Sequence, residues 1–119
     1  MSRSEDSVRL RPMLEAAREA MSFIQGQSRK ALDSNRMLVL SLVKCIEIIG
    51  EAASRVSPET QAKHTGIPWV DIVGMRNRLI HAYFEIDLDR VWDTVTDDLP
   101  PLISELEKAS ASEEGREAA

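Results

Sequence analysis

Several features that define whole classes of protein are scarce or missing in this 119-residue sequence. A single cysteine, Cys45, excludes an internal disulfide framework, and its place in an apolar run indicates a buried thiol. No stretch approaches the ~20 apolar residues that a membrane-spanning helix needs. The segment MSRSEDSVRLRP lacks the apolar core of a signal peptide. We therefore expect a protein of the reducing cytoplasm with no part in a membrane.

Acidic residues outnumber basic ones, and histidine is scarce. The formal net charge is −5, so any contact with nucleic acid must come from a local basic patch. Of the two histidines, His64 lies in a polar stretch with no second ligand at metal-binding spacing, which indicates a surface residue. The sequence has no glycine-rich phosphate loop and no serine or cysteine nucleophile constellation. We expect no metal site and no bound cofactor.

Apolar residues recur at helical spacing along most of the chain, and no segment shows the alternation of a half-buried strand. The expected helices run over residues 8–27, 33–56, 69–82 and 87–99. Pro100 and Pro101 then either kink the last helix or begin a fifth. The sequence predicts an all-α bundle of four or five helices over residues 1–108, followed by a disordered tail over residues 109–119.

The second expected helix carries apolar residues on two faces. Its main apolar stripe covers about half of the circumference. Leu40 and Ile48 fall outside this stripe, on an otherwise polar face. They suggest a second contact surface, although single exposed apolar residues are common in soluble proteins.

The third expected helix, WVDIVGMRNRLIHAY, has a charged residue in an apolar position. Its apolar side chains fill an arc of about 160°, and Arg76 projects from the middle of that arc. A guanidinium cannot shed its charge, so it must meet a carboxylate, a dimer groove or a bound anion. Glu47 and Glu51 on the preceding helix are candidate carboxylates. Position alone leaves a structural ion pair and an anion site equally open.

His81 lies about 140° from Arg76 on an ideal helix, on the polar side, where Asn77 is one turn before it and can contact it. Taken alone, a histidine near a helix C-terminus is a structural cap favoured by the helix dipole. If Arg76 and His81 serve one site, the helix must end or distort near His81, or the arginine must reach around it. Tyr83 falls on the apolar arc, as a core aromatic would.

The string PWVDIVGMRNRLIHAYFEIDLDRVWDTVTDDLPPLI closely resembles the HepT-like branch of the HEPN superfamily. Arg76, His81 and Tyr83 stand in that family's arrangement R-x4-H-x-Y. The similarity runs from about residue 66 to residue 103, and KCIEIIGEAA over residues 44–53 resembles the family's second helix. The resemblance implies a HEPN-type helical bundle that forms a homodimer.

The same resemblance implies a metal-independent endoribonuclease toxin whose partner antitoxin is a minimal nucleotidyltransferase. Carried onto this chain, Arg76 and His81 would be catalytic, and the partner would add AMP to Tyr83. Ala82 stands where relatives often have glycine. A bulky anionic group at Tyr83 would fill and electrostatically oppose an RNA-phosphate site beside His81.

The residues themselves suit this chemistry. Cleaving RNA without a metal requires a base for the 2′-hydroxyl, an acid for the leaving oxygen, and positive charge for the phosphorane. Histidine, with an ordinary pKa of ~6.5, can act as acid or base, and arginine offers a fixed charge with phosphate-matching donors. Because one chain has one well-placed histidine, a symmetric dimer would supply the second. Asn77 could orient the imidazole or bind a phosphate oxygen, and Arg78 adds positive charge.

A second hypothesis treats the same groove as a noncatalytic module that binds nucleotide or docks a nucleotidyltransferase. The complete set of Arg76, His81 and Tyr83 favours the ribonuclease. A binding module would need no histidine that titrates near neutrality. A purely structural helical oligomer is the third reading, and the position of Arg76 argues against it.

Overall fold

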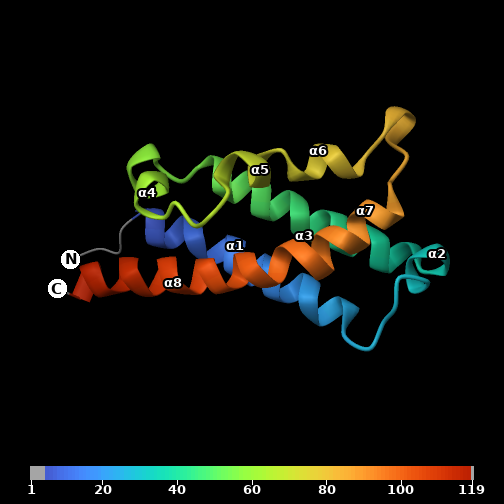
Figure 1. Ribbon diagram of the computed structural model, residues 1–119, viewed down its shortest axis with the longest axis horizontal. Coiled ribbons are helices and arrows are strands. Elements are labelled where there is room, and N and C mark those ends of the chain that lie inside the picture. Colours follow the sequence, from blue (N-terminus) through green and yellow to red (C-terminus); the bar gives the residue numbers. More distant parts are fainter. Residues whose placement is uncertain (1–4, 119) are drawn as a thin grey trace.

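The computed structural model describes residues 5–118 as a helical bundle, which confirms the predicted all-α class (Figure 1). Its long helices are α1 (Glu5–Ile24), α3 (Arg36–Ser54) and α8 (Leu99–Ala118). α1 packs along both α3 and α8. α1 begins and α8 ends at the same end of the molecule (Figure 1). Over the described residues, no helix is both long and apolar enough to cross a membrane.

Side-chain caps decide where several helices begin. After the short helix α2 (Ala31–Ser34), the Asn35 side chain accepts a hydrogen bond of 3.0 Å from the Leu38 amide and starts α3. Ser57 caps α4 (Pro58–Lys63) in the same way by accepting from the Thr60 amide at 3.3 Å. The two polar residues satisfy amides that have no partner within their helices.

The last expected helix begins where the sequence predicts, at α7 (Leu88–Asp93). It then passes through a π-helical turn, η2 (Thr94–Asp98), directly into α8. Pro100 and Pro101 have no amide hydrogen to donate, so the helical ladder is interrupted just before them. The hydroxyls of Thr94 and Thr96 donate to the Arg90 and Trp92 carbonyls at 2.7 and 2.8 Å. The prolines therefore produce a wide turn within a continuous helix.

The core lies between α1, α3 and the α7–α8 helix. Its largest fully buried side chains include Leu10, Met13, Leu42, Ile46, Ile49, Ile67, Leu79, Leu99 and Leu106. Cys45 is buried, as predicted, and its thiol lies 3.7 Å from a carboxylate oxygen of Glu19. Burial first, and the Glu19 charge second, raise the pKa of Cys45 to about 11. This thiol is therefore protonated and unreactive at neutral pH.

The C-terminal residues differ from the disordered tail that their composition predicted. α8 continues through Ala118, and both Ala109 and Glu113 are buried. These positions extend the spacing of Leu102 and Leu106, so the buried stripe of α8 continues into a polar sequence. The Glu113 carboxylate lies 3.0 Å from Nε2 of His64, whose side chain is only 12% exposed. The expectation of a surface position for His64 was therefore wrong.

Candidate active site

The segment expected to be one helix is divided in the structure. α5 (Trp69–Val73) ends at Gly74, and α6 (Met75–Leu79) follows it at once. Ile80 is extended and pairs with Ile86 in an isolated antiparallel bridge. The His81 amide donates to the Glu85 carbonyl at 2.7 Å. The chain between α6 and α7 therefore forms a pinched loop that contains the 3-10 turn η1 (Ala82–Phe84) and projects from the bundle (Figure 1).

A glycine on α3 sets the position of α5. A Cβ atom on Gly50 would lie 3.1 Å from the Ile72 carbonyl oxygen and 3.5 Å from that of Val73. The missing side chain lets the backbones of α3 and α5 approach closely. This contact seats α5 over the C-terminal part of α3, and α6 also packs on α3.

The Arg76 guanidinium meets a carboxylate on α3, one of the partners that the sequence had left open. Its Nε atom lies 3.5 Å from Oε2 of Glu47, with the two side chains 41% and 43% exposed. The Nε atom is itself buried, and no hydrogen bond within the described residues satisfies it. Lys44, which donates to Glu47 at 3.0 Å, and then Arg76 lower the pKa of Glu47. The arginine is thus half-exposed and held beside a carboxylate, with donor capacity to spare.

The His81 ring is held by a carboxylate from the start of α7. Its Nε2 atom lies 3.2 Å from Oδ2 of Asp87, and the His81 side chain is 58% exposed. The other Asp87 oxygen accepts a hydrogen bond of 3.0 Å from the Arg90 amide and caps α7. That bond, and next the one with His81, lower the pKa of Asp87. An ionised Asp87 therefore orients the imidazole.

Arg76 and His81 face different elements within one chain. Arg76 pairs with α3, whereas His81 pairs with the first residues of the α7 segment. The helix ends at Leu79, as the hypothesis of a shared site requires, yet no hydrogen bond joins the two side chains in the described part of the chain. Within one chain, the guanidinium of Arg76 and the imidazole of His81 are therefore held separately, each by its own carboxylate.

Tyr83 occupies the tip of the loop and not the core. Its side chain is 99% exposed, which excludes the alternative of a core aromatic. The apolar arc assumed a helix through Tyr83, but the helix stops four residues earlier. Tyr83 also has a φ of 61°, the left-handed region that a non-glycine residue rarely adopts. The phenol is fully open to a second protein.

A family model described as "Ribonuclease HepT-like" matches residues 13–109. The chain belongs to the HepT-like family. It is 33% identical over 107 residues to "Putative RNase MJ1380" of Methanocaldococcus jannaschii, covering 90% of this chain and 98% of that protein. It is 34% identical over 96 residues to "Putative RNase TTE0752" of Caldanaerobacter subterraneus subsp. tengcongensis, with 77% and 86% covered. "Probable ribonuclease HepT" of Thermococcus cleftensis is 33% identical over 99 residues, with 80% and 90% covered. No solved structure gives a significant match.

The two supporting residues of this HepT-like chain lie where the short helix α6 directs them. Asn77 is exposed, but no hydrogen bond to His81 is present among residues 5–118, because the expected contact required a continuous helix. Arg78 donates from Nη2 to the Asp71 carbonyl at 2.6 Å. It therefore stays near the site, on the opposite side of α6 from Arg76.

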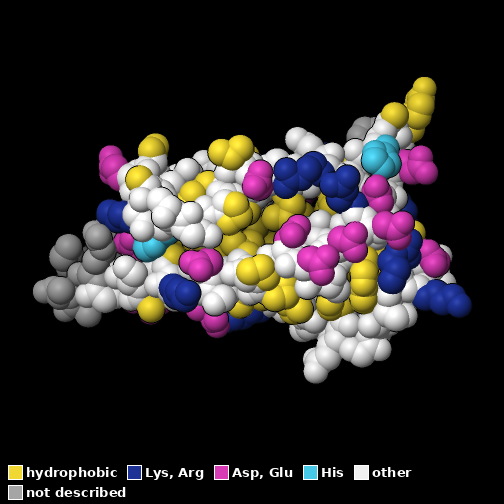
Figure 2. Space-filling model, viewed as in Figure 1, with side chains coloured by type: hydrophobic (Ala, Val, Ile, Leu, Met, Phe, Trp, Pro, Cys, Tyr) yellow, Lys and Arg dark blue, Asp and Glu magenta, His cyan; other side chains and the backbone are white. Residues whose placement is uncertain are grey.

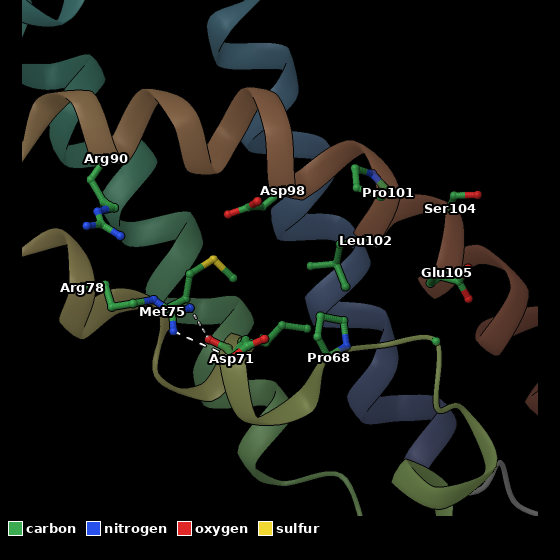
Figure 3. Close-up of a pocket in the computed structure, with 12 residues that line it drawn as sticks. Pro68, Asp71, Met75, Arg78, Arg90, Asp98, Pro101, Leu102, Ser104 and Glu105 are labelled. Carbon is green, nitrogen blue, oxygen red and sulfur yellow. Dashed lines mark hydrogen bonds and ion pairs between the residues drawn. The ribbon is translucent and has the colours of Figure 1, made fainter.

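A groove of about 740 Å³ lies between the α5–α6 segment and the α7–α8 helix. Figure 2 shows it as a hollow with an apolar interior, bordered by basic side chains over α6 and by acidic ones over the facing helix. Figure 3 shows Arg78 and Arg90 on opposite walls at one end of the groove. Met75 and Leu102 contribute to its apolar lining. The groove thus combines apolar surface with two guanidinium groups at one end.

Sequence reasoning missed two residues of the candidate site. Asp87 is the first residue of the expected helix over residues 87–99, and capping that helix is half of its role; no role was expected for Arg90. The capping position of Asp87 was the available signal, but its contact with His81 depends on the loop closing. Within the described residues, no group of three or more His, Cys, Asp or Glu side chains is placed to hold a metal ion.

Proposed function

We propose that this HepT-like chain is a metal-independent endoribonuclease toxin, in which His81 and Arg76 cleave RNA. The observation that carries the proposal is the exposed His81 imidazole, oriented at 3.2 Å by the Asp87 carboxylate. A carboxylate that accepts from Nε2 leaves the lone pair on Nδ1. That nitrogen can take the proton of a ribose 2′-hydroxyl, and the imidazolium can return a proton to a leaving oxygen.

Arg76 is the candidate for stabilising the phosphorane. Its guanidinium keeps a full positive charge and has five N–H donors, of which the contact with Glu47 occupies few. A phosphate oxygen could therefore bind the exposed part of the group. Donors already in place where charge develops are worth more than donors that must first be organised.

A homodimer would complete the site, because one chain offers one histidine for two proton transfers. A second copy of the chain could pack on the outer stripe of α3, which is the exposed face of this helix that carries Leu40 and Glu47. Leu40 on this stripe is 47% exposed, and Glu47, seven residues later, lies on the same side of the helix. Arg76 reaches Glu47, so a copy that covers Leu40 would also lie close to Arg76.

The dimer can be tested with a charge on that stripe. Leu40→Asp should yield a folded monomer in sedimentation equilibrium and lose RNA cleavage. Val70→Asp is the matched control, because Val70 is 88% exposed on α5 and away from α3's outer stripe. A Leu40→Asp variant that stays dimeric would place the interface elsewhere.

Neutralisation would act at Tyr83. Its exposed phenol, two residues from His81, is accessible to a partner nucleotidyltransferase that adds AMP. The added phosphate would bring negative charge and bulk beside the site, which opposes the entry of another phosphate. Tyr83→Phe should therefore resist modification, detected as a missing mass increment, while it keeps cleavage activity.

The ribonuclease itself is tested with RNA in EDTA. Wild type should leave products that end in 2′,3′-cyclic phosphate, and His81→Ala, with unchanged helicity, should leave the RNA intact. Asp87→Asn should reduce cleavage and not abolish it, because it removes the orienting charge and keeps the imidazole. If neither wild type nor His81→Ala cleaves any of several RNAs, with Tyr83 shown unmodified by mass, the noncatalytic docking module replaces this proposal.

A further inference from the structure

The groove between the α5–α6 segment and the α7–α8 helix has the size of a nucleotide site. Its volume of about 740 Å³ lies within the ~300–1,000 Å³ of small-molecule sites. Ile72, Met75 and Leu102 are buried residues that line it, so its floor is apolar. A flat aromatic base can cover such a floor at little cost, because its faces make no hydrogen bonds.

Arg90 links the groove to the proposed catalytic histidine. Its backbone amide donates to the same Asp87 carboxylate that holds His81. Its guanidinium points into the groove (Figure 3) and makes no hydrogen bond or ion pair with any described residue. Arg78, on the facing wall, donates from Nη2 to the Asp71 carbonyl, and its Nη1 lies 4.0 Å from the Asp71 carboxylate; the rest of its five donors can meet a ligand. A phosphate between these walls would meet two guanidinium groups, one of them on the residue whose amide shares the Asp87 carboxylate with His81.

The remaining charges limit what the groove can hold. Asp98 and Glu105 line it beyond the arginine end, and Asp71 lies beside Arg78 (Figure 3). Burial, and then the charge of Asp97, raise the pKa of Asp98, whereas the charge of Arg78 lowers it. A second phosphate along the groove would add repulsion. A base edge, in contrast, offers N–H groups that a carboxylate accepts.

We propose that this groove binds the one nucleotide of an RNA strand that flanks the scissile phosphodiester, with its phosphate between Arg78 and Arg90 and its base against Met75 and Leu102. The assignment rests on the proposed ribonuclease function. It deepens that function by naming how the substrate is positioned. It adds Arg90 as a positioning residue that no motif of the sequence marks.

Binding to uncleavable RNA tests the site separately from catalysis. The probe is a fluorescein-labelled single-stranded RNA carrying 2′-O-methyl groups, which lack the attacking hydroxyl, and the readout is fluorescence anisotropy. Arg90→Gln should weaken binding about tenfold, the effect of losing one charge-assisted contact. It should also lower the slope of log K against log salt by about 0.7. Arg11→Gln is the matched control, since Arg11 is exposed on α1 outside the groove. It should change neither value.

A second measurement tests the base. Placing an abasic ribose next to the cleaved bond, on either side in turn, should slow cleavage by wild type at one of the two positions. In the binding assay, Arg90→Lys keeps the positive charge and should recover part of the affinity that Arg90→Gln loses. The helicity of each variant confirms that it is folded.

The outcomes separate the two proposals. If Arg90→Gln and Arg11→Gln bind alike while wild type still cleaves RNA, the groove assignment is wrong and the ribonuclease stands. If binding depends on Arg90 and wild type cleaves nothing, the groove binds RNA without cleaving it, so the ribonuclease is wrong and the assignment to a scissile bond falls with it. If neither abasic position affects cleavage, the base does not occupy the groove.

Discussion

Arg76 offers the sharpest separation of a structural role from a catalytic one, because its ion pair is half-exposed. The Arg76–Glu47 contact of 3.5 Å joins side chains that are 41% and 43% exposed. Pairs in such surroundings contribute about 0.2–1 kcal/mol, since solvent screens the charges. Arg76→Ala should therefore lower the free energy of unfolding by less than ~1 kcal/mol in urea. It should nevertheless lower RNA cleavage by about 100-fold or more, the effect of losing a charge that stabilises a transition state.

Two further variants complete this test. Glu47→Gln removes the partner and keeps the guanidinium, so cleavage should remain within a few-fold of wild type. Arg55→Ala removes another arginine that pairs with an α3 carboxylate, Glu51 at 2.8 Å, and should leave cleavage unchanged. The reasoning fails if Arg76→Ala unfolds the chain by more than ~3 kcal/mol, the cost of breaking a buried pair. It also fails if Glu47→Gln and Arg76→Ala reduce cleavage equally, because the pair would then act as one structural unit.

Three other predictions concern the framework of the site. Gly50→Ala should lower the free energy of unfolding, measured in urea, by about 1 kcal/mol. Crowding the Ile72 carbonyl oxygen, 3.1 Å from the new Cβ atom, costs about 1–3 kcal/mol, and the better helix propensity of alanine offsets about 1 kcal/mol of that cost. A stabilised variant would show that α5 moves freely. His64→Ala should lower the free energy of unfolding by about 1–3 kcal/mol, because it leaves the buried Glu113 carboxylate without its imidazole partner. The double variant with Glu113→Ala should recover part of that loss. Faster amide hydrogen exchange along α8 in the single variant would locate the effect. Glu47 and Asp87 have lowered pKa values in the folded chain, so their stabilisation is present above their unfolded pKa values of about 4 and is lost as the pH falls through the folded ones. The urea midpoint of unfolding should therefore fall less between pH 6 and pH 3 for the double variant Glu47→Gln/Asp87→Asn than for wild type. Equal falls in the two proteins would contradict the lowered pKa values.

The helices were predictable because their signals are local. Apolar periodicity, the prolines and the capping residues lie within each segment, so the all-α class and the start of α7 follow from the sequence. The same locality explains the error over the tail. Its polar composition predicted disorder, whereas Ala109 and Glu113 keep the spacing of the buried α8 stripe. These two positions alone are too few to predict a helix against the polar composition, unless one knows what packs against them.

The loop around His81 could not be predicted in the same way. The helical wheel placed Tyr83 on the apolar arc because it assumed that every residue advances by about 100°. The chain leaves the helix because the Asp87 amide bonds the Leu79 carbonyl at 2.7 Å, a contact across eight positions of sequence. Glu47, in contrast, was among the expected partners of Arg76, because a charged residue in an apolar position needs a carboxylate nearby.

The break after α6 explains how a motif of such short spacing can serve two walls of one site. In a continuous helix, His81 would point about 140° from Arg76 and would be held by Asn77. Because the helix ends at Leu79, His81 instead contacts Asp87, while Arg76 pairs with Glu47 on α3. Two carboxylates from different elements thus hold the two candidate groups apart and exposed. Since neither group completes an acid–base pair alone, a second copy of the chain is a requirement of the proposed chemistry and not an addition to it.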